Sequence, residues 1–286
     1  MLGSLADLKN SDQQNDVVIV GGGAAGLTLA HALGATGRSV LLFEAGGDKR
    51  TKASQEFYRG ELVDKVVHPS TDNYRVRAIG GTSTIWGGRA IPFDPIDFEK
   101  RDWVPASGWP FGREALAGYY GRAMDAAEAG RPEFFPEGAL PGAQKELAPG
   151  LDGDLVQTTV ERFSKPTNFW RRYGEELTRS DRVRIVKDAP VVHIQLAADG
   201  NSVDWIEVAS PDGSRTKVRG RSYVLALGGL ETTRLLLASN DVRHAGIGND
   251  SDHLGRNYMS HLCATSGTIS FAGPPEGVAY DYARDA

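Results

Sequence analysis

The sequence predicts an α/β fold in which a buried parallel sheet carries helices and a β-meander is inserted between its strands. Three observations support this prediction. Residues 16–45 show an apolar strand, a glycine turn, a helix-forming stretch and a second apolar strand. Residues 182–220 hold short alternating strands separated by turn residues. Residues 222–239 then repeat the first pattern with a buried strand, a double glycine and an amphipathic helix.

The first of these segments has the order of a right-handed βαβ unit. The run "DVVIV" at residues 16–20 is continuous and β-branched, as in strands that are buried on both faces of a parallel sheet. Residues 24–37 are rich in helix formers and end at a glycine, and residues 39–45 return as an apolar strand. We expect the irregular polar stretch 46–77 to form a loop or a short helix.

The later segments indicate a single discontinuous domain. Residues 113–129 have the apolar spacing of an amphipathic helix. Within 182–220, the turns "ADGNS" and "PDGS" separate alternating runs, which predicts a β-meander. Two α/β pieces separated by a β insert are typical of one nucleotide-binding domain. The predicted meander strands are "RVRIV", "VVHIQLA", "VDWIEVAS" and "SRTKVRG".

The composition argues against several classes of partner. The formal net charge of −5 and the scattered arginines give no basic surface for nucleic acid or an anionic membrane. The single cysteine, Cys263, leaves no disulfide framework and no cysteine-based zinc site, so we expect no metal. No apolar run approaches the ~20 residues that cross a bilayer, and residues 1–15 lack the pattern of an export signal. We therefore expect a cytoplasmic protein without a membrane span.

The glycine turn matches the pattern G-x-G-x-x-G at the start of a helix. Gly21 permits the tight turn, Gly23 lets the backbone approach a pyrophosphate, and Gly26 lets the helix pack closely on the strand. Ala25 lies in the first helical turn, where free N–H groups and the helix dipole favour an anion. Glu44, 18 residues beyond Gly26, ends the second strand and is expected to accept a ribose hydroxyl. This combination predicts dinucleotide binding but does not distinguish FAD from NAD.

Several longer motifs distinguish the two cofactors by resemblance. In chain order they are "GGGAAG", "GGTSTIWGG", "FDPIDFE", "GWPFGREALAGYYGRA", "SKPTNFWRRY", "LALGGLETTRLLLAS" and "HLGRNYMSH". With these motifs, the chain resembles the glucose-methanol-choline (GMC) oxidoreductase family from residue 16 to about residue 261. The resemblance implies a Rossmann-like domain that binds FAD in an extended form. It also implies oxidation of a sugar or other alcohol by hydride transfer from its CH–OH carbon to flavin N5.

The glycine-rich loop that begins at Gly80 is costly to order without a ligand. By the family resemblance, the backbone and hydroxyl groups of Gly80, Gly81, Thr82 and Ser83 face the pyrophosphate and the edge of the flavin ring. No bulky side chain in these four positions blocks such an approach. The alternative is an ordinary surface loop, since functional and plain loops share this composition.

Two further residues of this loop specify the expected mode of flavin attachment. The loop is most similar to that of pyranose oxidase and related sugar oxidoreductases, in which a histidine of the loop bonds covalently to the flavin. Ile85 stands at that position here and has no nucleophile, so we expect FAD to be bound non-covalently. Trp86 is expected to flank the flavin ring, with core packing as the alternative.

Three residues in later strands match family positions around the adenosine part of FAD. Val191 matches the position whose backbone meets the adenine, and Ala226 and Gly228 match the end of the strand beside the adenosine. A β-branched residue in a strand and a glycine after one are also explained without a ligand.

The sequence assigns no catalytic residue. In the family, the catalytic histidine and its partner histidine or asparagine lie in the C-terminal part, and none of the histidines here lies in such a motif. Alcohol oxidation needs a base within reach of the substrate hydroxyl. We therefore expect a C-terminal half or a companion subunit to carry the catalytic pair, and we expect no alcohol turnover by this chain alone. The histidines present are His31, His68, His193, His244, His253 and His261.

Three functions remain as alternatives. The first is the flavin-binding half of an alcohol or sugar oxidoreductase. The second is a flavin protein that uses FAD for binding or electron transfer without oxidising alcohols. The third is an NAD-linked dehydrogenase, which leaves the motifs "GGTSTIWGG" and "GGLETTRLLLAS" unexplained.

The expected domain organisation follows from these assignments. We expect a disordered tail, a first part of the FAD-binding domain, a β-rich insertion with the start of the substrate domain, a return of the FAD-binding domain, and a further start of the substrate domain. These segments are residues 1–15, 16–130, 131–220, 221–262 and 263–286, respectively.

Overall fold

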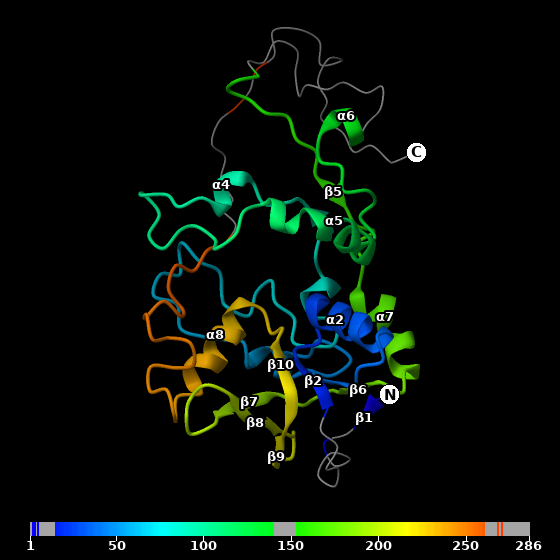
Figure 1. Cartoon of the computed structure of the whole chain (residues 1–286), viewed down its shortest axis with the longest axis vertical. Coiled ribbons are helices and arrows are strands. Elements are labelled where there is room, and N and C mark those ends of the chain that lie inside the picture. Colours follow the sequence, from blue (N-terminus) through cyan, green and yellow to red (C-terminus); the bar gives the residue numbers. More distant parts are fainter. Residues whose placement is uncertain are drawn as a thin grey trace. The chain divides into compact units, whose positions relative to one another are not determined.

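The computed structural model describes residues 2–3, 5, 15–139, 153–260, 268 and 270 (Figure 1). The chain divides into two compact units. The first is Met1–Trp86 with Thr167–Asn257, and the second is Gly87–Pro166 with Tyr258–Ala286. Apart from residues 268 and 270, the expected segment 263–286 lies outside the described residues, as do Cys263 and His261.

The first unit contains the predicted parallel sheet. Its strand order is β1-β6-β3-β2-β10, and every neighbouring pair is parallel. The continuous β-branched run predicted at residues 16–20 forms the centre of the sheet, where Val18 and Ile19 are fully buried. The parallel α/β fold is therefore confirmed. The strands are β1 (Leu2–Gly3), β2 (Asn15–Val20), β3 (Val40–Phe43), β6 (Val183–Val186) and β10 (Gly220–Leu225).

Two strands of this sheet differ from the sequence prediction. The run "RVRIV" was predicted to begin the meander, but β6 pairs in parallel with β3, with Ile185 opposite Leu42. Its apolar side chains are buried on the sheet, which an isolated meander strand could not achieve. Leu2 and Gly3, expected in a disordered tail, pair with Ile185 and Val186 because β6 would otherwise present an open sheet edge.

The predicted meander consists of three antiparallel strands in the first unit. They are β7 (Val191–Leu196), β8 (Val203–Ala209) and β9 (Arg215–Val218), in the order β7-β8-β9. The turns between them contain Gly200 and Gly213, both at positive φ, as the turn sequences require. A single apolar core joins the meander to the parallel sheet and includes Phe43, Ile206 and Leu235.

Helices cover the parallel sheet of the first unit. The predicted βαβ helix is α2 (Ala24–Ala35), and it packs against α7 (Phe169–Arg179) (Figure 1). At this contact the His31 ring stacks on Tyr173 with 4.5 Å between ring centroids. The return segment forms α8 (Gly229–Ala238), which packs against β7. The stretch expected as loop or short helix contains α3 (Lys52–Glu56).

The second unit begins at Gly87, whereas the first part of the FAD-binding domain was expected to continue to residue 130. The reason is local packing. Strand β4 (Arg89–Ala90) pairs with β5 (Arg162–Phe163), and Met124, Ala129 and Phe134 form a small apolar cluster. Residues before and after 130 are therefore parts of one unit. Its helices are α4 (Pro95–Phe98), α5 (Glu114–Ala127) and α6 (Pro136–Ala139), of which α5 corresponds to the helix predicted at 113–129.

None of the helices within the described residues combines the length and apolar character that a membrane-spanning helix needs.

The close contact between α2 and the glycine turn predicts a large effect on stability for Gly26→Ala. A Cβ atom at Gly26 would lie 1.9 Å from the Gly21 carbonyl oxygen, so the helix would have to move away from β2. We expect the free energy of unfolding to fall by about 3 kcal/mol in urea titrations of the cofactor-free chain. Gly229→Ala is the matched control because no atom lies within 4 Å of its added Cβ. Equal unfolding midpoints for the two variants would contradict the prediction.

Candidate functional site

The carboxyl ends of β2 and β10 meet at the glycine turn. The Ala226 N–H donates to the Val20 carbonyl oxygen at 2.7 Å. Gly21 follows with φ of 111°, and an added Cβ would lie 2.4 Å from the Ala226 carbonyl oxygen. Only glycine satisfies both the backbone angle and the close approach. Gly21 and Ala226, predicted from separate motifs, are thus neighbours at the sheet edge where ligands of open α/β sheets bind.

The N-terminus of α2 is open beside this turn. Gly23 is the N-cap residue, and no side chain caps the helix. An added Cβ at Gly23 would meet no atom within 4 Å, and Ala25 in the first turn is exposed. The first-turn N–H groups of a helix have no acceptor within the helix and carry its positive dipole end. This end of α2 therefore has the space and the charge to hold a phosphate group.

Glu44 has a structural role that the sequence analysis did not anticipate. Its Oε2 accepts the Gly22 N–H at 2.8 Å and its Oε1 accepts the Gly46 N–H at 2.7 Å. Burial raises the pKa of the carboxyl group, against the opposing effect of these two N–H groups. A carboxylate offers about four lone pairs, so two bonds leave capacity for the ribose hydroxyl that the sequence predicts. Glu44 fastens the glycine turn to the chain that leaves β3.

The structure brings the second glycine motif onto the first. Residues Gly81–Thr84 form a short 3-10 helix, η1, preceded by Gly80 at φ of 94°. The Gly80 N–H donates to the Gly22 carbonyl oxygen at 2.8 Å. A Cβ on Gly81 would lie 3.0 Å from the Gly23 Cα. The two motifs, more than fifty residues apart in sequence, therefore form one continuous backbone surface at the start of α2.

Side chains from η1 anchor this loop to the start of α7. The Ser83 hydroxyl donates to the Gly80 carbonyl oxygen at 2.6 Å and accepts the Phe169 N–H at 3.3 Å. The Trp86 Nε1 donates to the Thr167 carbonyl oxygen at 2.9 Å. Ser83 is buried by these contacts whereas Thr82 is exposed, so the two hydroxyls predicted to face a ligand differ in access.

The motif "SKPTNFW" has an anchoring role that was not predicted from the sequence. Asn168 is the N-cap of α7, and its Oδ1 accepts the N–H groups of Trp170 and Arg171 at 3.0 and 3.1 Å. An asparagine before an aromatic helix-forming run is a recognisable N-cap signal. Trp86 is half-buried, with 6.3 Å between the centroids of its ring and the Phe169 ring. The neighbouring Ile85 is 49% exposed.

A cavity of about 170 Å³ lies beside the carboxyl ends of β2 and β3. Val20, Phe43 and the predicted Val191 form its apolar floor. The predicted Gly228 is the N-cap residue of α8. It is exposed and has φ of 78°. Other wall residues come from the stretch expected as irregular, from the chain just before α8 and from α8 itself, and they were not predicted from the sequence. They include Phe57, Tyr58, Arg77, Leu227, Glu231 and Arg234.

Tyr58 keeps its proton under all ordinary conditions. Burial, and to a lesser extent the Glu44 and Glu231 carboxylates, raise the pKa of its hydroxyl to about 12. The cavity wall therefore presents a hydroxyl that is able to donate a hydrogen bond.

The residues described around the turn, the loop and the cavity include no histidine. His31 contacts Glu176 at 2.8 Å and His193 contacts Asp241 at 2.9 Å, and neither histidine lines the cavity. Within the same described part of the chain, no group of three or more His, Cys, Asp or Glu residues could hold a metal ion. The arrangement can hold a phosphate group and an apolar ring, but its described residues offer no histidine to act as a base.

Comparison with known proteins gives two curated relatives. Paromamine 6'-oxidase from Streptomyces fradiae is 25% identical over an alignment 314 residues long, gaps included. The alignment covers 90% of this chain and 55% of the relative. The fructose dehydrogenase large subunit from Gluconobacter japonicus is 24% identical over an alignment 325 residues long, which covers 89% of this chain and 60% of the relative. The chain thus spans little more than half the length of these relatives.

A solved structure and a family model agree with these relatives. The crystal structure of pyridoxine 4-oxidase from Mesorbium loti matches with a TM-score of 0.53 and 25% identity, covering 79% of this chain and 52% of that one. The family model described as FAD dependent oxidoreductase (DAO) matches residues 16–267, which is most of the chain and includes both glycine motifs. The chain belongs to the FAD-dependent oxidoreductase family, and its cofactor is FAD.

Proposed function

We propose that this chain is the flavin-binding part of a GMC-type oxidoreductase of the pyranose-oxidase-like branch, which oxidises a CH–OH group of a sugar or other alcohol. The observation that carries the proposal is the hydrogen bond from the Gly80 N–H to the Gly22 carbonyl oxygen, 2.8 Å long. It joins two of the motifs that carry the resemblance to the GMC family. The names of the relatives, which act on paromamine, fructose and pyridoxine, support an alcohol-bearing substrate.

The residues of the site fit the parts of FAD in a definite order. The turn Gly21–Gly26 and the start of α2 hold the pyrophosphate, where the open space over Gly23 admits it. Glu44 accepts a ribose hydroxyl, and the cavity floor at Val191 receives the adenine. Thr82 and Trp86 would face the flavin ring, and Ala226 and Gly228 would border the adenosine. Bound FAD supplies the acceptor for the hydride that leaves the substrate carbon.

The proposal assigns the catalytic base to residues beyond this site. Hydride removal requires that the substrate hydroxyl lose its proton, and the described residues around the turn, loop and cavity offer no histidine for this step. The chain matches 55% and 60% of its two relatives, so their remaining parts have room for the base. The name "large subunit" of one relative supports a companion subunit as a second source.

The open space at Gly23 predicts a variant that loses FAD without losing its fold. Gly23 has φ of −81°, so alanine is tolerated by the backbone, and its Cβ meets no protein atom within 4 Å. That Cβ would instead occupy the path of the pyrophosphate. We expect Gly23→Ala to weaken FAD binding by about tenfold or more, measured by flavin fluorescence, with an unchanged urea midpoint for the cofactor-free chain.

Gly118→Ala is the control for this experiment, because its added Cβ also meets no atom within 4 Å and it lies in α5. It should bind FAD as the unchanged chain does. Unchanged FAD affinity in Gly23→Ala would contradict the proposed pyrophosphate site. A chain stabilised against heat by NAD and not by FAD would contradict the whole proposal.

Ile85 predicts that the flavin is not tethered at this loop. An alkyl side chain forms no bond to the flavin, so acid precipitation of the FAD-loaded chain should release all flavin into the supernatant. Absorbance of the supernatant and of the redissolved pellet measures the two fractions. Flavin retained in the pellet would show a covalent bond and would overturn the assignment of Ile85 to the tethering position.

The absence of a base at the described site predicts that the isolated, FAD-loaded chain does not oxidise alcohols at an enzymatic rate. General-base assistance is worth about 10²–10⁴ in rate. Anaerobic incubation with a panel of sugars and primary alcohols should leave the absorbance of oxidised flavin unchanged over minutes. Dithionite reduction is the control for a competent flavin. Rapid bleaching by a sugar would move the search for a base to His193, His253 and His261.

A further inference from the structure

One wall of the cavity is formed by a segment that is remote from the other walls along the chain. Phe57, Tyr58 and Arg77 belong to the irregular stretch between β3 and η1, whereas Glu231 and Arg234 belong to α8. The cavity has a defined width only if these two walls are held together. A direct polar link between them is the ion pair between Arg75 and Glu231, whose Nη1 and Oε1 atoms are 3.0 Å apart.

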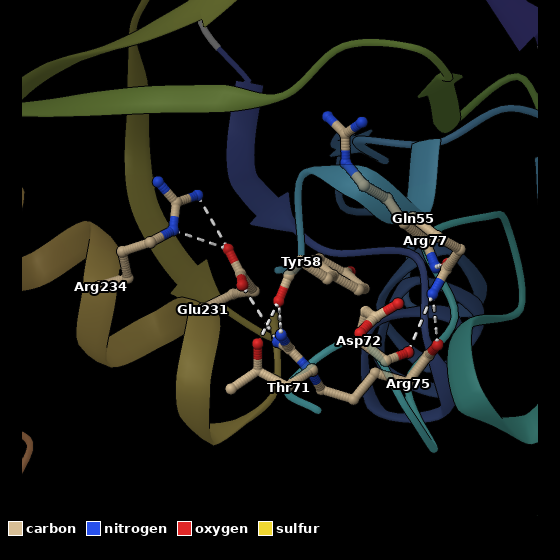
Figure 2. A network of polar contacts seen from close by, with 8 residues as sticks. All are labelled: Gln55, Tyr58, Thr71, Asp72, Arg75, Arg77, Glu231 and Arg234. Carbon is tan, nitrogen blue, oxygen red and sulfur yellow. Dashed lines mark hydrogen bonds and ion pairs between the residues drawn. The ribbon is translucent and has the colours of Figure 1, made fainter. Parts of the chain in front are cut away.

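Arg75 organises the irregular segment as well as reaching α8. Its Nε donates to the Thr71 carbonyl oxygen at 2.6 Å, and its Nη2 donates to the Tyr58 carbonyl oxygen at 2.9 Å. Its guanidinium also lies over the Tyr58 ring, 4.2 Å from the centroid. Figure 2 shows Arg75 with Tyr58 and Thr71 on its own segment and Glu231 across from them on α8. One planar group therefore fixes two carbonyls and one carboxylate at once.

The backbone on either side of Arg75 is itself fixed. The buried Gln55 side chain donates to the Arg75 carbonyl oxygen at 2.8 Å and accepts the Arg77 N–H at 2.8 Å. Arg77 in turn lies over the Phe57 ring, 4.4 Å from the centroid. The contacts of Gln55 with Arg75 and Arg77, shown in Figure 2, fix the backbone from which the Arg75 side chain reaches the carboxylate of α8.

The ion pair is sheltered from water. The Arg75 and Glu231 side chains are 21% and 12% exposed, whereas most ion pairs among the described residues have an exposed member. The second oxygen of Glu231 accepts the Arg234 Nε at 2.9 Å, but Arg234 itself is 67% exposed. Sheltered charge pairs are stronger than exposed ones, so Arg75 is the partner that holds Glu231 in place.

We propose that Arg75 is a positioning residue for the adenosine end of FAD, which it serves by fixing the Tyr58 wall of the cavity against Glu231 of α8. The inference rests on the proposed function, in which this cavity receives the adenosine. Without the ion pair the two walls separate, and the site must be ordered when the cofactor binds. Such an ordering cost weakens binding without removing any contact that Arg75 itself makes with FAD.

The test uses the full chain with the substitution Arg75→Met, which keeps the aliphatic stem and removes the guanidinium. Affinity and dissociation rate for FAD are measured by flavin fluorescence, and affinity for ADP by competition. We expect the Kd for FAD to rise about tenfold or more, mainly through faster dissociation, and the Kd for ADP to rise by a similar factor. The urea midpoint of the cofactor-free chain should fall only modestly, because the segment keeps its Gln55 contacts, and the binding measurements are made without urea, where the variant is folded.

A double-mutant cycle with Glu231→Gln isolates the ion pair, and this milder variant also serves if Arg75→Met does not fold. We expect the double variant to bind FAD no more weakly than Arg75→Met alone, since both changes remove the same link. Arg219→Met is the matched control, because Arg219 pairs with Asp204 on the meander surface at 3.1 Å. It should leave FAD binding unchanged.

The outcomes separate this inference from the proposed function. Unchanged FAD and ADP binding in Arg75→Met, or additive losses in the cycle, would overturn the positioning role and leave the proposed cofactor site intact. A large fall in the urea midpoint of Arg75→Met, with normal FAD binding by Glu231→Gln, would show a purely structural role and overturn it as well. Failure of the unchanged chain to bind FAD or ADP would overturn both proposals.

Discussion

The site depends on one buried carboxylate. Glu44 lies at the end of β3 and accepts the N–H groups of Gly22 and Gly46, so it joins the glycine turn to the chain that continues toward the second motif. Gly22 then accepts the Gly80 N–H, which joins that motif to the turn. Buried carboxylates are costly unless they are hydrogen-bonded, and a backbone turn rich in glycine is costly to order. Both costs are offset here, because the Glu44 carboxylate accepts the N–H groups of the glycine-rich backbone.

Much of the fold could be predicted because its signals are local. The βαβ unit shows its strand, turn and helix patterns within a few tens of residues, and the meander shows two glycine turns. The position of β6 could not be predicted in this way. The alternation in "RVRIV" fits a meander strand and a short parallel strand equally, and its pairing with β3 joins Ile185 to Leu42, which is remote along the chain. The pairing of Leu2 with β6 has no local signal at all.

The residues of the candidate site likewise fall into those that local sequence signals predict and those that only the folded chain brings together. Glycines such as Gly21 and Gly26 were predicted because close backbone contact leaves no alternative residue, as the distances of added Cβ atoms show. The double use of Glu44 was not predicted, since a sequence does not show which backbone N–H groups surround an acid. Tyr58 and Arg75 lie in a stretch without any periodic pattern. Their importance follows from the bond between them and from the bond of Arg75 to Glu231 of α8, which only the folded chain creates.

The stretch between β3 and η1 has a narrow neck. The Gly46 and Arg77 backbones pass so closely that a Cβ on Gly46 would lie 2.3 Å from the Arg77 carbonyl oxygen, and the Ile79 N–H donates to the Gly47 carbonyl oxygen at 3.0 Å. Val63 and Val66, at the far end, are almost fully exposed. Since the neck fixes both ends of the stretch, changes of length or sequence at the exposed tip around Val63 and Val66 do not alter the parallel sheet. Evolution can therefore rebuild this tip, and an engineer can insert a peptide tag or reporter there, while the cofactor-facing backbone keeps its shape.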